Sequence, residues 1–241
     1  MRKFLALLSV ALLAFPAMAA TPKVWYDTDG VNVWRGEKNG REMTDIEPNK
    51  VFGSDYCWFV ADSAVWLSNL GDNEAAPIWI PLKKGEICQE IEMDPEQTLV
   101  FLCLTTKKTE TIAIFDLEGN RLAETPGVMG MGGYTLEWID PYRCLFTYSV
   151  PGTQRGKRSG LWRGAAVMEL FGKGGEDFEI LVTPVAEPTA TENYRAFGVA
   201  GDECVVIKYT VKSPKEWEQL DDGAEEAGQS EEIRIPVPAA G

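Results

Sequence analysis

Asp94-Pro95-Glu96-Gln97-Thr98-Leu99-Val100-Phe101 and Ile112-Ala113-Ile114-Phe115-Asp116-Leu117-Glu118-Gly119-Asn120 form the clearest structural unit of this 241-residue sequence. Each half contains a short run of β-branched, aliphatic or aromatic residues, and turn-forming Asp, Pro, Gly or Asn residues bound these runs. Short apolar runs between such turn signals are typical of β-strands. The stretch therefore predicts two strands, with one polar turn before the first and another after the second.

The same plan recurs in both directions along the chain. It is seen again at residues 138–146 with 166–174, in units that begin near Gly53 and Phe197, and as a partial unit at residues 30–40. After residue 22 no window keeps a 3.6-residue apolar period over ten residues, so the sequence predicts an all-β protein. A recurrence of about 40 residues favours a β-propeller of four-stranded blades over the alternative, a β-sandwich. The partial units at the two ends allow four or five blades, and we favour five.

A propeller is commonly closed by pairing a terminal strand with the blade at the other end, which removes an open edge. Residues 232–238 suit such a closing strand. In rhythm the chain resembles TolB-like propeller repeats, whose blades carry a Pro-Asp-Gly-type turn and a following Asp-x-x-Gly-type turn. The best match is residues 115–120, whereas Asp94-Pro95 and Asp140-Pro141 replace the first turn. The resemblance implies an architecture and no particular activity.

Five cysteines, an odd number, leave at least one thiol free or paired between chains. When the units are aligned, three of them fall at the first residue of a strand, with Thr98 as the fourth member, and this predicts a shared buried position rather than mutual disulfides. These three are Cys57, Cys144 and Cys204. Cys88 and Cys103 lie outside the alignment, so a bridge between them stays open.

The first twenty residues are typical of a secretory signal peptide. Arg2 and Lys3 precede an apolar run from Phe4 to Phe15, and Ala17-Met18-Ala19 is a small-x-small cleavage site. The run is shorter than the roughly 20 residues that span a bilayer, so we expect cleavage, no membrane insertion afterwards and a periplasmic or secreted protein. The expected organisation is a signal peptide at 1–20 and a single propeller domain at 21–241.

Charge and composition exclude several classes of function. Without Arg2 and Lys3 the chain carries 21 basic and 37 acidic residues, a net charge of −16, which disfavours nucleic acid and anionic membranes as partners. The chain has no histidine, so histidine-dependent triads and histidine-ligated zinc or haem are excluded. We expect no cofactor and no metal, and a protein or a glycan as the partner.

Two acidic motifs are candidate sites. Asp27-Thr28-Asp29-Gly30 resembles half of a calcium loop, but Lys38 stands at its twelfth position, and an Asp-Gly hairpin turn is the better interpretation. Glu137 and Asp140 are close in sequence and could serve as the carboxylate pair of a glycan-acting enzyme. Chance pairing is the competing explanation in a chain with 37 acidic residues.

Three further segments are predicted to be connections. Residues 127–133 are glycine-rich, yet neither a helix nor a lysine follows as a phosphate loop would need. The basic segment 154–160 and the acidic segment 216–232 read as surface loops, or as a complementary charged pair. Most of the eight tryptophans are expected in the core, and any that are exposed together would suit a glycan or a peptide.

The sequence therefore predicts an exported, non-catalytic propeller that acts as a binding or scaffolding module. The alternative is a carboxylate-dependent enzyme acting on a glycan, and a third possibility is a cation-binding structural protein. The enzyme would require Asp and Glu residues from several blades to converge at the mouth of the central channel. The scaffold would lack such a pair.

Overall fold

The computed structural model describes residues 22, 24–37, 40–72, 74–107, 110–125, 136–154, 157–173, 178–213 and 229–240. Within these residues the chain forms β-strands and connections, and no helix. The predicted all-β class is confirmed. No helix in the described ranges has the length and apolar character to span a membrane.

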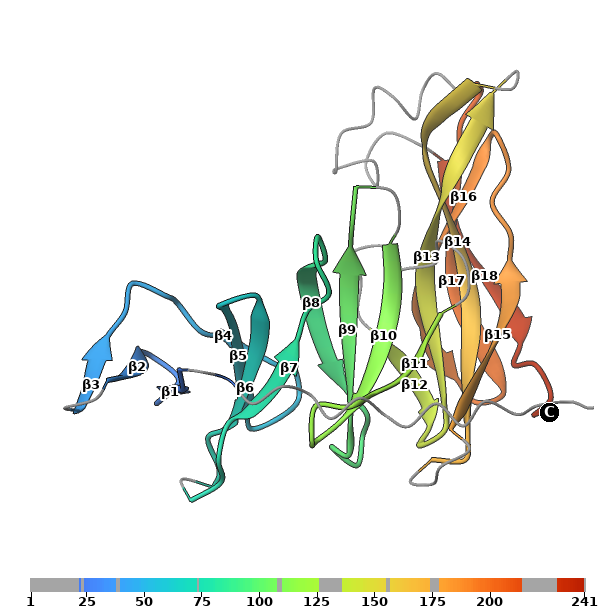
Figure 1. Ribbon diagram of the computed structural model, residues 1–241. Helices are drawn as coiled ribbons and strands as arrows, with labels where there is room; N and C mark the ends of the chain where they lie inside the picture. Colours follow the sequence, from blue (N-terminus) through green and yellow to red (C-terminus); the bar gives the residue numbers. More distant parts are fainter. Residues whose placement is uncertain are drawn as a thin grey trace, which may run out of the picture.

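The strands form five antiparallel sheets, numbered here in chain order (Figure 1). Sheet 1 contains β1 (Tyr26–Thr28), β2 (Val33–Glu37) and β3 (Gly40–Met43). Sheet 2 contains β4 (Asn49–Lys50), β5 (Tyr56–Ala61), β6 (Ala64–Asn69) and β7 (Ile78–Pro81). Sheet 3 contains β8 (Ile87–Met93), β9 (Leu99–Thr105), β10 (Glu110–Asp116) and β11 (Arg121–Glu124). Sheet 4 contains β12 (Glu137–Asp140), β13 (Arg143–Gln154), β14 (Lys157–Phe171) and β15 (Glu179–Ala186), and sheet 5 contains β16 (Glu192–Ala200), β17 (Glu203–Thr210) and β18 (Gln229–Pro236).

In every sheet, spatial order follows sequence order, so each is an up-and-down meander. The predicted unit at residues 94–120 forms the centre of sheet 3, where β9 and β10 pair from Leu99 with Asp116 to Thr105 with Glu110. Five sheets of three or four strands match the expected repeat, and the β-sandwich alternative is wrong.

The core lies in layers between successive sheets. Four apolar clusters join sheets 1 and 2, 2 and 3, 3 and 4, and 4 and 5. Strand β9 belongs to two of them, because Val100, Leu102 and Leu104 face sheet 2 while Leu99, Phe101 and Cys103 face sheet 4. A strand covered on both faces needs an unbroken apolar run, which the sequence supplies.

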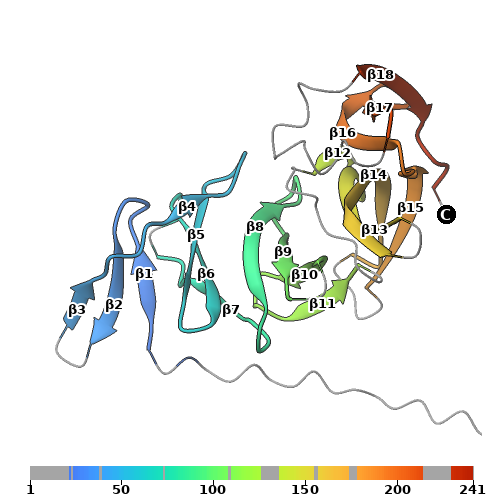
Figure 2. The same ribbon diagram turned by 90° about the horizontal axis from the view of Figure 1, so that it is seen from above.

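The predicted closing strand does not close a ring. Residues 229–236 form β18, which pairs with β17 from Glu203 with Pro236 to Thr210 with Gln229. Ile233 and Ile235 pack on the cluster between sheets 4 and 5, so burial sets this register. Sheets 1 and 5 lie at opposite ends of an arc (Figure 2), and no apolar cluster of the described residues joins them.

Two turns predicted from sequence are confirmed. Asp116 Oδ1 accepts hydrogen bonds from the backbone N–H groups of Glu118 and Asn120, at 2.9 and 2.8 Å. Gly119 in this turn has φ +82°, and its Cα lies against the carbonyl oxygen of Trp79 in sheet 2. The Asp27–Gly30 motif spans the end of β1 and the start of the hairpin connection to β2, where Asp29 accepts hydrogen bonds from two backbone N–H groups.

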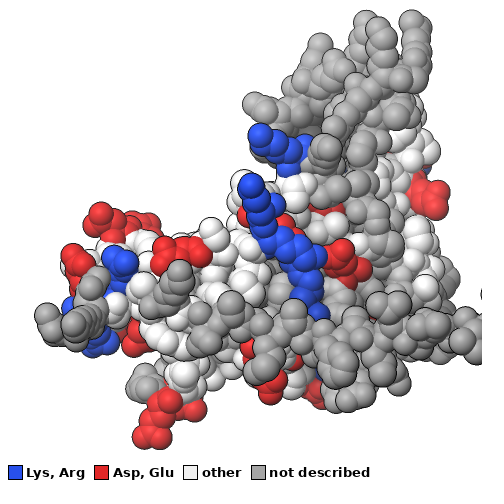
Figure 3. Space-filling model, viewed as in Figure 1, with Lys and Arg blue, Asp and Glu red and all other residues white. Residues whose placement is uncertain are grey.

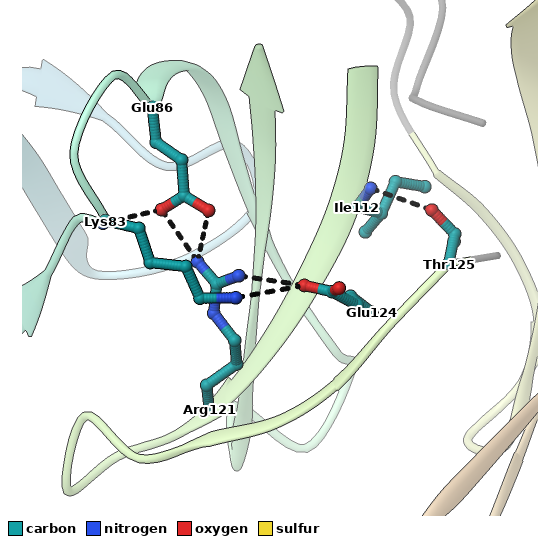
Figure 4. A network of polar contacts seen from close by, with 6 residues as sticks. All are labelled: Lys83, Glu86, Ile112, Arg121, Glu124 and Thr125. Carbon is teal, nitrogen blue, oxygen red and sulfur yellow. Dashed lines mark hydrogen bonds and ion pairs between the residues drawn. The ribbon is translucent and has the colours of Figure 1, made fainter. Parts of the chain in front are cut away.

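The outer edge of sheet 3 is held by an ion-pair network (Figure 4). Arg121 Nη2 lies 2.9 and 2.8 Å from the two carboxylate oxygens of Glu86, and Arg121 Nη1 lies 2.9 Å from Glu124 Oε2. Lys83 adds a longer contact of 3.5 Å to Glu124. The network ties β11 to the connection between β7 and β8, and thus sheet 3 to sheet 2.

All five cysteines are free and buried. Cys57, Cys144 and Cys204 are each the second residue of the second strand of their sheet. Cys144 and Cys204 pack toward the preceding sheet, and the Cys57 thiol lies near Thr28 of the preceding sheet. The predicted shared position is confirmed, but in sheet 3 Val100 occupies it and Thr98 lies in the turn before β9.

A bridge between Cys88 and Cys103 is not formed. The two thiols belong to the clusters on opposite faces of sheet 3, Cys88 toward sheet 2 and Cys103 toward sheet 4. The β-sheet backbone therefore separates them.

Several predicted segments lie outside the described residues, namely the signal peptide at 1–20, the glycine-rich segment 127–133 and residues 216–228 of the acidic segment. The basic segment is described in part. Gln154 ends β13 and residues 157–160 begin β14, so these residues extend a long hairpin rather than form a loop. Residues 229–232 of the acidic segment belong to β18.

Candidate functional site

A hollow of about 320 Å³ lies where sheets 2, 3 and 4 meet. The residues that line it come from the turn before β5, the end of β8 with the turn after it, and β12 with the residue before it. Strands β4, β8 and β12, the first of their sheets, lie on the concave side of the arc (Figure 2). We call this hollow the concave pocket. Its lining residues are Phe52, Gly53, Ser54, Glu92, Met93, Asp94, Pro95, Gln97, Leu136, Glu137 and Trp138.

The turn between β8 and β9 shapes one wall of the concave pocket. Asp94 Oδ1 accepts hydrogen bonds from the backbone N–H groups of Thr98 and Leu99, at 2.7 and 2.6 Å. Asp94 Oδ2 lies 2.6 Å from Lys173 Nζ, and both side chains are almost fully buried, at 0% and 6% exposure. Lys173 follows β14, so this ion pair joins sheets 3 and 4. The charge of Asp94 is therefore compensated, and its role is to hold the turn.

Glu92 differs from Asp94 because its charge is not compensated. The residue is 8% exposed. No described residue donates a hydrogen bond to its carboxyl group, and none forms an ion pair with it. Burial raises the pKa of Glu92 to about 7, and the nearby charges of Glu90 and Glu137 act in the same direction. Near neutral pH this carboxyl group is therefore about half protonated.

Of the predicted carboxylate pair, the structure places only Glu137 in the concave pocket. Asp140, at the other end of β12, accepts hydrogen bonds from Arg143 Nε at 2.8 Å and from the Tyr142 backbone N–H at 2.9 Å. Partial burial opposes the change, but these hydrogen bonds lower the pKa of Asp140. Asp140 is thus a turn residue, and Glu137 is accompanied by Glu92 from the neighbouring sheet instead.

Sequence reasoning missed Glu92. In the run from Ile87 to Met93, Ile91 and Met93 alternate with Glu90 and Glu92, a pattern typical of a strand with one wet face. The structure covers that face with sheet 4, because Phe101 of β9 contacts Trp138 of β12 edge-to-face at 5.5 Å between ring centroids. A signal was present in the glutamate that lies two residues before the Asp94-Pro95 turn, on the first strand of a unit.

Apolar groups complete the concave pocket. Met93 and Leu136 are 6% exposed, and Trp138 is half-buried. Phe52 stands at the rim and is 82% exposed. The lining thus combines three carboxylates with aromatic and aliphatic surface, and it includes no lysine or arginine. Such a site can accept hydrogen bonds from a ligand, bind a cation, or donate a proton from Glu92.

A second hollow of about 420 Å³ lies between sheets 3 and 4, beside Tyr142 and Lys173. Its charged groups already have partners, because Lys173 binds Glu96 at 2.8 Å and Asp116 holds its own turn. It is therefore a weaker candidate than the concave pocket. Among the residues that the structure describes, no three potential ligands from His, Cys, Asp and Glu gather as a metal site would require.

No protein-family model matches the chain, and no curated protein matches it. The resemblance to TolB-like repeats therefore stays a prediction. Among solved structures, a hydrazine synthase of Kuenenia stuttgartiensis is similar with a TM-score of 0.41 and 10% identity, over 89% of this chain and 71% of the other.

Two other similar structures are peptidases. One comes from a study of two prolyl endopeptidases, with a TM-score of 0.39 and 11% identity over 78% of this chain and 28% of the other. The second is prolyl oligopeptidase B of Galerina marginata, with a TM-score of 0.40 and 12% identity over 78% of this chain and 29% of the other. This chain spans under a third of the length of either peptidase. Likeness at this level assigns neither a fold family nor an activity.

Proposed function

We propose that the protein is an exported binding module built as a five-bladed, propeller-like arc, with the concave pocket as its binding site. The observation that carries this proposal is the position of the pocket, which lies where three sheets meet and is lined by apolar and acidic groups together. Concave sites with apolar walls and a few convergent polar groups are typical of ligand pockets. Export is supported by the signal-like first twenty residues.

A protein partner is favoured over a glycan for this pocket. Glycan platforms usually present exposed aromatic rings side by side, whereas Trp138 is half-buried against Phe101 and only Phe52 stands free at the rim. An exposed phenylalanine beside a part-polar hollow is suited to a partner surface that inserts one side chain and covers the ring.

Photo-crosslinking tests this function. Benzoylphenylalanine is introduced at Phe52 in the exported, full-length protein, and in a matched control at Phe197, which is 57% exposed in sheet 5 and does not line the pocket. We expect irradiation of cells to give one discrete protein adduct from position 52 and none from position 197. Adducts of equal yield from both positions, or none from either, would contradict the proposed site.

A carboxylate-dependent enzyme is the second candidate, and one observation favours it. Glu92 and Glu137 come from neighbouring sheets to one pocket, and the pKa of Glu92 is raised to about 7, as a general acid requires. The enzyme hypothesis requires carboxylates from several blades to converge on one site. Hydrolysis of any glycan in a nitrophenyl-glycoside panel, abolished by both Glu92→Gln and Glu137→Gln but kept by Asp140→Asn, would support the enzyme over the binding module.

A further inference from the structure

We propose that the concave pocket binds a basic side chain, a lysine or an arginine, of the protein partner, with Glu92 and Glu137 facing its charge. This inference rests on the proposed binding function and names the chemistry that the partner must present. Glu92 is the central observation, because it is more than nine-tenths buried, lines the pocket and has no donor or cation among the described residues.

Asp94, another acidic residue of the lining, shows by contrast what Glu92 lacks. Asp94 has Lys173 at 2.6 Å and two backbone N–H groups, a complete set of partners from within the chain. A carboxylate that is buried without such partners is costly, and a cation supplied from outside would remove that cost. The chain therefore supplies its own lysine to one carboxylate of the pocket and leaves the neighbouring one for a ligand.

The walls of the pocket suit the stem of a basic side chain. Lysine and arginine carry their charge on three or four methylene groups, which pack on apolar surface while the charged end reaches a polar group. Leu136 and Trp138 offer that surface beside Glu92 and Glu137. The ring of Trp138 adds a face that attracts a cation. A small metal ion would use none of these apolar contacts.

Binding is expected to depend on pH. The titratable groups that act on Glu92 or respond to it are Glu90 on its own strand, Glu137 on β12 and the Cys144 thiol on β13. Only the ionised form of Glu92 attracts a cation, and burial holds its pKa at about 7. The affinity for a basic side chain should therefore rise between pH 6 and pH 8, by about tenfold, because Glu92 passes from mostly protonated to mostly ionised.

The experiment uses two small probes that differ in their charge. Nα-acetyl-lysine methylamide and Nα-acetyl-norleucine methylamide share the four-carbon stem, and each is titrated into the 15N-labelled protein at pH 8 with amide chemical shifts as the readout. We expect the lysine probe to bind at least ~10-fold more tightly than the norleucine probe, with shifts in β8 and β12. Nα-acetyl-arginine methylamide, titrated in the same way, should show the same preference over the norleucine probe.

Three variants make this test specific. Glu92→Gln should lower the affinity for the lysine probe to that for the norleucine probe. Glu92→Asp retains the negative charge and should keep the preference, so that a loss in Glu92→Gln can be attributed to the charge and not to misfolding. Glu179→Gln removes the same charge from an exposed site on β15 outside the pocket and should change nothing. Equal affinity for the two probes, absence of binding, or a preference that survives Glu92→Gln would each overturn the proposal.

The outcome separates this inference from the function on which it rests. A crosslink at Phe52 together with equal binding of lysine and norleucine would overturn the basic side chain and leave the binding site in place. The free diamine cadaverine is the last probe. If it binds more tightly than the blocked lysine, a free amine is the ligand and the assignment to a protein side chain is wrong.

Discussion

At the residue scale, the buried carboxyl group of Glu92 links function to stability. Its pKa is raised to about 7 by burial first and by Glu90 and Glu137 second, so the folded state holds its proton more tightly than the unfolded state. A carboxyl group whose pKa is higher in the folded state than in the unfolded state contributes least to the stability of the folded state when it is ionised. Stability should therefore fall as the pH rises from about 4.5 to about 7.

We expect Glu92→Gln to remove this dependence. The amide keeps the shape of the side chain but cannot ionise, so the variant should be more stable than the wild type at pH 8, by about 1–3 kcal/mol. The measurement is urea denaturation at pH 5 and pH 8, with Glu179→Gln as the control. A variant that is less stable than the wild type at pH 8 would show that Glu92 has a structural partner.

Lys173 is the opposite case, a buried charge with partners. Burial disfavours its charge, but the hydrogen bonds that it donates to Asp94 and Glu96 prevail and raise the pKa of Lys173. Lys173→Met would leave Asp94 buried without its cation, at a cost of about 3 kcal/mol in the free energy of unfolding. Lys83→Met removes an exposed ion pair to Glu124 and should cost under ~0.5 kcal/mol. Thermal unfolding of both variants at pH 7 tests the difference, and equal losses would contradict it.

At the scale of the element, the turns were the most predictable part of the molecule. The Asp116-x-x-Gly119 turn follows from its residues alone, because the aspartate caps backbone N–H groups and the glycine takes a positive φ. What the sequence could not convey is that the same glycine lies against the Trp79 carbonyl group of the preceding sheet. That contact depends on how two sheets pack, which no local pattern encodes.

A matched pair of glycines separates these two effects. Gly201 has φ +62° and open space where a Cβ would stand, so Gly201→Ala should cost only the backbone penalty of about 1 kcal/mol. Gly119→Ala adds a collision with the Trp79 carbonyl oxygen, and we expect a loss of about 2 kcal/mol or more. Urea midpoints of the two variants provide the comparison. Similar losses for both would mean that sheets 2 and 3 separate easily at this point.

Strand β8 shows why the candidate site was only half predicted. Glu137 stood out because a second acid lies three residues away, and that second acid, Asp140, proved to be a turn residue paired with Arg143. Glu92 did not stand out because alternation with Ile91 and Met93 made it resemble a surface residue. The function of a polar residue on a strand is set by the sheet that covers it, and that sheet is about 45 residues away in the chain.

At the scale of the whole molecule, charge and architecture act together. Acidic side chains are spread over the face shown in Figure 3, with a band of lysine and arginine across its middle. The chain carries 37 acidic and 23 basic residues, so its long-range field attracts cationic partners toward a pocket that has no basic residue in its lining. This field would raise the association rate of a basic partner most strongly at low ionic strength.

Among the residues that the structure describes, four inter-sheet clusters join the five sheets, so these residues form an arc with two ends rather than a ring. In such a layered array each sheet is stabilised only by its neighbours, so the end sheets have one interface and the inner sheets two. The burial of the strands agrees, since β9 is covered on both faces whereas every residue of β3 is exposed. We expect amide hydrogen exchange to be slowest in β9 and β10 and fastest in β3 and β18. In a closed ring the fifth interface would join sheets 1 and 5 and protect both, so exchange in β2 and β17 as slow as in β9 would show that the ends meet in solution.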